Sequence, residues 1–166
     1  TPPDKKVLKS SPVPLEEIAL PYEYYTEEDL KQRLLYVEAS RGCPFKCEFC
    51  LSSLDKSSVP FELDSFLEQM EILYQRGARN FKFIDRTFNL NIDTTIKIMQ
   101  FFLDRMTDDL YLHFEVVPDH LPRKLKALLA QFPENCLQFE IVIQTFNTQV
   151  QANINRKQNN AKSKDN

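Results

Sequence analysis

Three cysteines stand close together in the stretch Cys43-Pro-Phe-Lys-Cys47-Glu-Phe-Cys50. Three thiolates at this spacing can bind one face of an iron–sulfur cube, whereas clusters that only carry electrons usually take four cysteine ligands. A cube held by three cysteines leaves one iron open to an outside ligand, as a catalyst requires. The spacing therefore predicts an iron–sulfur cluster bound by Cys43, Cys47 and Cys50.

Two other uses of these cysteines stay open at this point. A structural zinc ion would need a fourth ligand. The candidates in this sequence are His113, His120 and Cys136. Cys136 begins the predicted fourth strand and the cysteine loop follows the first, so in a parallel sheet they would lie at opposite ends. Cys136 is therefore expected to be a small buried residue. A redox pair of Cys47 and Cys50 would leave Cys43 without a role.

The elements that position these residues follow from short apolar runs that alternate with helical periodicity. Strands are predicted at 34–40, 81–85, 111–117 and 137–143, and helices at 63–76, 92–106, 122–129 and, more weakly, 147–155. This alternation indicates an α/β fold with a parallel sheet and right-handed crossovers. The first strand is not followed by a glycine-rich phosphate loop, so a dinucleotide-binding fold has no support.

The first, third and fourth predicted strands are each apolar on one face and polar on the other, since side chains alternate along a strand. In the third strand Leu112, Phe114 and Val116 share one face, while His113 and Glu115 share the other. A parallel sheet is normally apolar on both faces. One interpretation is an antiparallel sheet with a solvated face. The other is a barrel whose interior is a polar ligand chamber, and the helical connections favour it.

The cysteine motif, with Arg41-Gly42 before it and Phe49 inside it, resembles that of the radical S-adenosylmethionine (SAM) superfamily. The stretches 36–53 and 83–89 resemble, more closely, bacterial radical SAM proteins with an upstream cobalamin-binding domain. The resemblance implies a partial parallel (β/α) barrel of the radical SAM type, of which this chain would supply about four βα units.

The resemblance and the composition together divide the chain into three parts. Residues 31–158 are expected to form the N-terminal part of the radical SAM barrel. Five of the ten prolines lie before residue 22, so 1–30 are expected to be a proline-rich linker from an upstream domain. Residues 159–166 are expected to be a polar disordered tail.

Roles for single residues are also implied by the resemblance. Cys43, Cys47 and Cys50 would bind a 4Fe–4S cluster whose open iron chelates SAM. The implied SAM contacts are Phe49 near the adenine, Asp85 at the amino group, Glu115, Gln144 at the ribose and Arg156 at the carboxylate. Val142 stands where the family usually has glycine, which would crowd the cofactor.

The implied activity is reductive cleavage of SAM to methionine and a 5′-deoxyadenosyl radical, which takes hydrogen from a substrate. The electron would come from a donor such as flavodoxin or ferredoxin. Cobalamin would enter only through an upstream domain and would allow methyl transfer. No residue pattern identifies the substrate, a small molecule or a peptide. The alternative is a non-catalytic iron–sulfur or zinc fragment that needs further strands or a partner.

Length and composition limit the class of protein and the kinds of partner that this chain can have. The chain has 166 residues, 42% hydrophobic and 27% charged, as expected for one globular domain. A net charge of −3 argues against nucleic acid as a partner. Neither a long apolar run nor a secretory signal pattern occurs, so we expect no membrane span and a cytoplasmic location. In that reducing compartment, four cysteines indicate metal binding or catalysis.

Overall fold

The computed structural model describes residues 13–54 and 57–165. Their main sheet has four strands in the order β1-β4-β5-β6. The strands are β1 (Leu35–Val37), β4 (Asn80–Phe83), β5 (Tyr111–Val116) and β6 (Leu137–Ile141). Every neighbouring pair is parallel. The predicted α/β fold is therefore confirmed, and the antiparallel interpretation is wrong.

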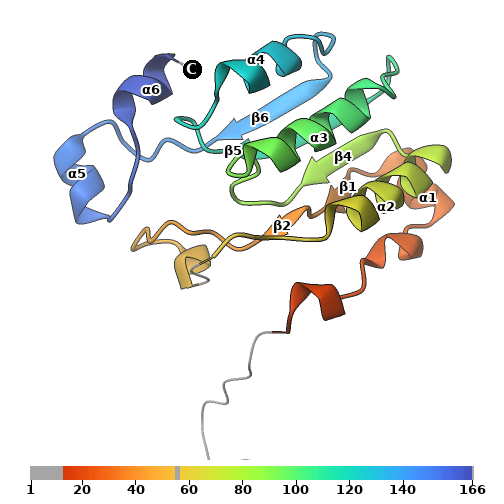
Figure 1. Ribbon diagram of the computed structural model, residues 1–166, viewed down its shortest axis with the longest axis horizontal. Coiled ribbons are helices and arrows are strands. Elements are labelled where there is room, and N and C mark those ends of the chain that lie inside the picture. Colours follow the sequence, from red (N-terminus) through yellow and green to blue (C-terminus); the bar gives the residue numbers. More distant parts are fainter. Residues whose placement is uncertain (1–12, 55–56, 166) are drawn as a thin grey trace, which may run out of the picture.

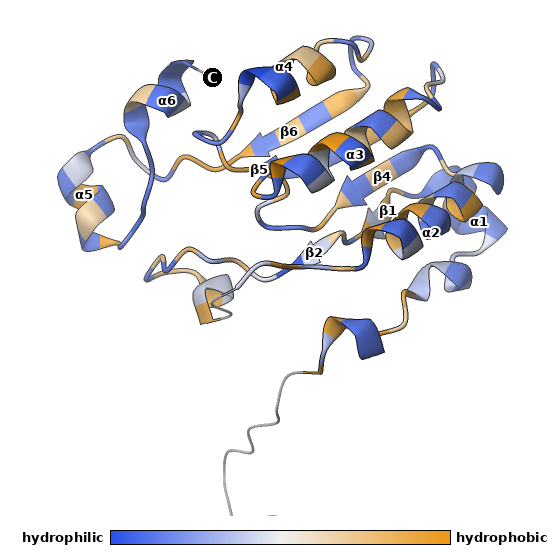
Figure 2. Cartoon of the chain, in the orientation of Figure 1, coloured by the Kyte–Doolittle hydropathy of each residue, from blue (hydrophilic) through white to orange (hydrophobic). Residues whose placement is uncertain are grey.

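Helices α2 (Leu63–Gln75), α3 (Ile92–Leu103) and α4 (Arg123–Leu129) connect successive strands and lie along one face of the sheet (Figure 1). Local chemistry sets their ends. Asn91 caps α3 because its side chain accepts the Thr94 N–H at 3.2 Å. Gly77, with φ of 100°, ends α2 in the left-handed conformation that a glycine adopts without strain. Both α2 and α3 alternate hydrophilic and hydrophobic residues, as helices on a core do (Figure 2).

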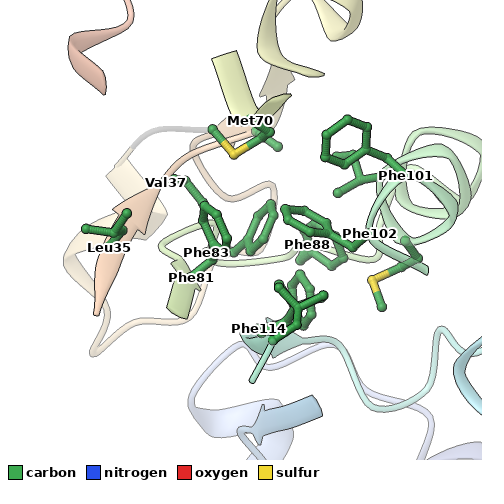
Figure 3. Close-up of a cluster of buried hydrophobic side chains, with 14 of the residues drawn as sticks. Leu35, Val37, Met70, Phe81, Phe83, Phe88, Phe101, Phe102 and Phe114 are labelled. Atoms are coloured by element: carbon green, nitrogen blue, oxygen red, sulfur yellow. The ribbon is translucent and has the colours of Figure 1, made fainter. Parts of the chain in front are cut away.

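Phenylalanine side chains fill the space between these helices and the sheet (Figure 3). Phe83 lies among them, with ring centroids 4.6 Å from Phe114 and 5.0 Å from Phe88. The Phe102 ring lies 6.1 Å from Phe83 and 5.2 Å from Phe81. All of these rings are buried. The strand face predicted to be apolar is therefore the face that forms the core.

The opposite face of the sheet is polar, as predicted. Lys82 and His113 are neighbours in the β4–β5 register. Both reach the same carboxylate oxygen of Glu140, with Lys82 Nζ at 3.3 Å and His113 Nε2 at 3.4 Å. Tyr36, next to Lys82 in β1, is 55% exposed. On this face Tyr36, Lys82 and Glu140 are at least partly open to solvent, whereas His113 is buried.

The segment expected to be a linker is folded where the structure describes it. Residues 15–32 contain the 3-10 helices η1 (Leu15–Glu17) and η2 (Pro21–Tyr24) and the helix α1 (Glu27–Gln32). Tyr22 and Leu30 are 4% and 2% exposed and belong to the core. Their burial explains why this proline-rich segment is ordered. Residues 1–12, the rest of the expected linker, lie outside the described residues.

Three further elements complete the fold. The two-stranded antiparallel pair β2 (Ser40–Arg41) and β3 (Val59–Pro60) was not predicted, because Ser40 was included in the first strand. The weak helix is confirmed as α5 (Thr148–Asn153). The segment expected to be a tail contains α6 (Asn160–Asp165), whose Asn160 exchanges hydrogen bonds with the buried Gln151. Among the described residues, every helix is too short or too polar to cross a membrane.

Candidate active site

The cysteine loop begins beyond the carboxyl end of β1, on the side of the sheet where α5 also lies (Figure 1). Gly42 opens the loop with φ of 94°, a backbone conformation that favours glycine. Cys43 and Cys47 are buried, Cys50 is half-buried, and all three are free thiols. Carboxyl ends of parallel strands are where βα folds place their sites.

The three cysteines line one cavity together with most of the predicted SAM contacts. Its volume is about 90 Å³. The lining residues are Cys43, Phe45, Cys47, Phe49, Cys50, Ser52, Arg86, Thr87, Glu115, Val116, Val117, Val142, Gln144 and Arg156. Folding thus brings together residues more than 100 positions apart in sequence, as Arg156 and Cys47 are. Val142 lies in the wall, where the sequence predicted that its side chain would crowd a cofactor.

Arg156 connects the segment after α5 to the cysteine loop. Its Nη1 donates to the Sγ atom of Cys47 at 3.7 Å, and its Nη2 donates to the Val142 carbonyl at 3.2 Å. The guanidinium carbon lies 5.2 Å from the centre of the Phe45 ring. The Nε atom is buried and has no hydrogen-bond partner in the structure. Among the described residues this donor therefore has no acceptor.

Burial raises the pKa of two lining residues, and nearby charges modify the effect. Burial raises the pKa of the Cys43 thiol, the neighbouring cysteines raise it further, and the positive charge of Arg156 opposes them. Burial also raises the pKa of Glu115, and Arg86 opposes that change from 3.3 Å away. The cavity therefore holds a carboxylate and two arginines, groups that recognise the charged ends of an amino acid.

Asp85 lies outside this cavity. It is 1% exposed, and its carboxylate accepts the Ala39 N–H at 3.0 Å and the Ser40 hydroxyl at 2.6 Å. Burial raises the pKa of Asp85 to about 6. Here Asp85 holds the chain that leads from β1 into the cysteine loop. Its contact with the SAM amino group stays a prediction.

The candidate zinc ligands also lie away from the cysteines. His113 faces Glu140, and His120 Nε2 is 3.2 Å from the Leu90 carbonyl. Cys136 is buried with its sulfur 3.7 Å from that of Met106. Within residues 13–54 and 57–165, no three metal-binding side chains converge on a single ion. A cube differs, because each thiolate bonds a different iron and the sulfurs need not meet at one point.

The lining residues that were not predicted include Phe45, Arg86 and Thr87. The Phe45 ring packs against the Arg156 guanidinium, and Arg86 forms an ion pair with Glu115. Thr87 is 4% exposed, and its hydroxyl has no hydrogen-bond partner in the structure. Their signal in the sequence is their place in the two stretches that carry the family resemblance, 36–53 and 83–89.

Comparison with known proteins decides the family. The model of the radical SAM superfamily matches residues 37–166, which is most of the chain. This chain belongs to the radical SAM superfamily. Its four-stranded parallel sheet is a partial radical SAM barrel.

Two of the proteins to which this radical SAM chain is similar are named as methyltransferases. An uncharacterized methyltransferase of Pyrococcus horikoshii is 41% identical over 75 residues, which cover 41% of this chain and 16% of that protein. The radical SAM methyltransferase TsrM of Kitasatospora setae, solved with cobalamin and a [4Fe–4S] cluster, aligns with a TM-score of 0.59. Its structure with tryptophan substrate and a SAM analogue aligns with a TM-score of 0.57.

The TsrM comparisons show the fold alone, since both are at 20% sequence identity. They cover 72% and 70% of this chain, and 24% and 23% of TsrM. The chain therefore spans about a quarter or less of these relatives.

Proposed function

We propose that this chain carries the cofactor site of a radical SAM enzyme, in which Cys43, Cys47 and Cys50 hold a 4Fe–4S cluster. The supporting observation is that one cavity is lined by the three thiols and by four of the five predicted SAM contacts. When bound, the cluster supplies the electron that cleaves SAM into methionine and a 5′-deoxyadenosyl radical. A flavodoxin or ferredoxin is the proposed source of that electron.

The chain's own residues bind and orient the cofactors. The free donor of Arg156 suits the SAM carboxylate, and Glu115 suits a positively charged or hydroxyl group. Pockets that bind molecules the size of SAM usually measure roughly 300 Å³ or more. The cysteine cavity, at about 90 Å³, is smaller than that. SAM would therefore extend past Phe49, which is 56% exposed, toward the open polar face of the sheet.

Cluster binding is tested by anaerobic reconstitution with iron and sulfide. We expect about four irons and four sulfides per chain, because three thiolates fit one cube. Cys43→Ala, Cys47→Ala and Cys50→Ala should each abolish the cluster. Cys136→Ser is the matched control, since Cys136 is buried against Met106 and should leave the iron content unchanged. Stoichiometric zinc in place of a cluster would contradict the proposal.

SAM binding is tested at Glu115. Glu115→Gln keeps the shape of the side chain and removes a charge-assisted hydrogen bond worth roughly 1.5–3 kcal/mol. SAM affinity, measured by equilibrium dialysis of the reconstituted protein, should fall about tenfold to a hundredfold, with the iron content unchanged. The exposed Glu16→Gln is the control and should change neither. Equal affinities of the wild type and Glu115→Gln would make Glu115 a structural partner of Arg86.

Methyl transfer is the second candidate, because both named relatives are methyltransferases. In the parent protein cobalamin would be held by another domain. The products of SAM separate the candidates. Reductive cleavage yields methionine and 5′-deoxyadenosine, and methyl transfer yields S-adenosylhomocysteine. A cluster-loaded protein that forms neither product with dithionite, SAM and added cobalamin, which accepts the methyl group, would favour the non-catalytic alternative.

A further inference from the structure

The chain after α5 turns back onto the cysteine loop. Asn155 is left-handed, with φ of 53°. Its N–H donates to the Ala152 carbonyl, and the Arg156 N–H donates to the Gln151 carbonyl at 2.9 Å, the pattern of a Schellman turn. The Ile154 carbonyl accepts the Glu48 N–H of the cysteine loop at 3.1 Å. The helix end is thus fastened to the loop, and the turn directs Arg156 toward the cysteines.

The side chain of Arg156 adds three contacts to this attachment: the sulfur of Cys47, the carbonyl of Val142 and the face of Phe45. Among the described residues, no carboxylate forms an ion pair with Arg156. A positive charge that no carboxylate balances therefore lies against one of the proposed cluster ligands.

We infer that Arg156 is a positioning residue that raises the reduction potential of the cluster held by Cys43, Cys47 and Cys50. The inference rests on the proposed function. Reduction adds one negative charge to the cluster, and a fixed cation beside a ligand thiolate favours the more negative state. Net charge and hydrogen bonds to the ligand sulfurs are the means by which proteins set such potentials. This role needs no SAM, unlike the predicted contact of Arg156 with the SAM carboxylate.

The experiment compares midpoint potentials without SAM. Reconstituted wild type, Arg156→Met, Arg156→Gln and Arg156→Lys are titrated with dithionite, which supplies the single electron, and the reduced cluster is followed by electron paramagnetic resonance. For both neutral variants we expect the ratio of reduced to oxidised cluster at a fixed potential to fall about tenfold, which is a shift of about 59 mV to more negative potential. Arg156→Lys keeps the charge and should restore most of the wild-type value.

Lys157→Met is the matched control. It removes the same charge from an adjacent exposed residue that does not line the cysteine cavity, and the midpoint potential should stay at the wild-type value. A merely structural role of Arg156 would lower iron content without moving the potential of the clusters that remain.

The outcomes separate this inference from the proposed function. Equal potentials of the wild type and a cluster-loaded neutral variant would overturn the inference and leave the proposed function standing. Loss of the cluster from both neutral variants, but not from Arg156→Lys, would assign Arg156 to cluster assembly and also overturn it. A wild type that takes up no cluster would overturn the proposed function itself.

Discussion

Asp85 is a nearly fully buried carboxylate whose two hydrogen bonds fix the chain just before the cysteine loop. Burial disfavours its charged form, which is why the pKa rises from 3.8 to about 6. Asp85 thus holds the chain before the loop, and Arg156 contacts Cys47 within it. A single buried acid can therefore matter to the site without lining its cavity.

This raised pKa predicts a pH dependence of stability. The folded protein binds the proton of Asp85 more tightly than the unfolded chain does, so the contribution is fully present below pH 3.8 and is lost as the pH rises to about 6. It amounts to roughly 3 kcal/mol. The advantage of the wild type over Asp85→Asn in free energy of unfolding should shrink by this amount between about pH 4 and pH 7, measured by urea unfolding.

The control for this experiment is Asp108→Asn, at an exposed carboxylate. Its stability should run parallel to that of the wild type over the same pH range. A difference between the wild type and Asp85→Asn that does not change with pH would show that Asp85 titrates as an ordinary solvent-exposed acid.

Helix α5 is short and lies beyond the sheet. The turn at its end places Arg156 against Cys47 of the cysteine loop. Only six residues form the helix, so it depends on its ends more than on its length. At its start the Asn147 side chain accepts the N–H groups of Gln149 at 2.9 Å and Val150 at 3.1 Å. At its end lies the Schellman turn at Asn155.

Removing the cap tests how far α5 depends on it. Asn147→Ala should destabilise α5 by about 1 kcal/mol, because two helix N–H groups lose their acceptor. Amide hydrogen exchange should become roughly fivefold faster in 148–153 and stay unchanged in β4 and β5. Asn147→Ser keeps an acceptor and should exchange like the wild type. Equal exchange in Asn147→Ala would mean that tertiary contacts alone hold α5.

At the scale of the whole molecule, the sheet separates a phenylalanine core from a polar face. Helices α2, α3 and α4 cover the apolar face (Figure 1), and the cluster around Phe83 joins them to the strands (Figure 3). The other face carries the Lys82, His113 and Glu140 group beside the cysteine cavity. One apolar and one polar face suit a sheet that lines the interior of a barrel and receives ligands there. This explains why a parallel sheet, which is normally apolar on both faces, has one polar face here.

The core prediction concerns Phe83, whose ring meets four others. Phe83→Ala should lower the free energy of unfolding by about 3–5 kcal/mol, since it removes buried surface and leaves a cavity. Urea unfolding at a single pH measures this loss. Phe49→Ala, at a ring that is 56% exposed, should change stability by less than about 1 kcal/mol. Similar losses for the two variants would show that Phe83 is not at the centre of the core.

The sequence alone predicted the α/β class, the parallel sheet, its apolar face and the cysteine motif. These features depend on spacing between near neighbours along the chain. Periodicity reports which side of a strand or helix a residue occupies whatever packs against it. The predicted separation of Cys136 from the cysteine loop follows from the parallel sheet, in which the start of one strand and the end of another lie at opposite edges.

Only the tertiary structure decided how the loops run and what they cover. Tyr22 and Leu30 enter the core, although their proline-rich surroundings indicated a linker. Asp85 faces Ala39 and Ser40 instead of the cavity, and Arg156 reaches Cys47 across 109 positions of sequence. The physical reason is that a side chain at the end of a strand changes direction with each residue. Its neighbours are then set by packing between distant segments, which spacing along the chain does not encode.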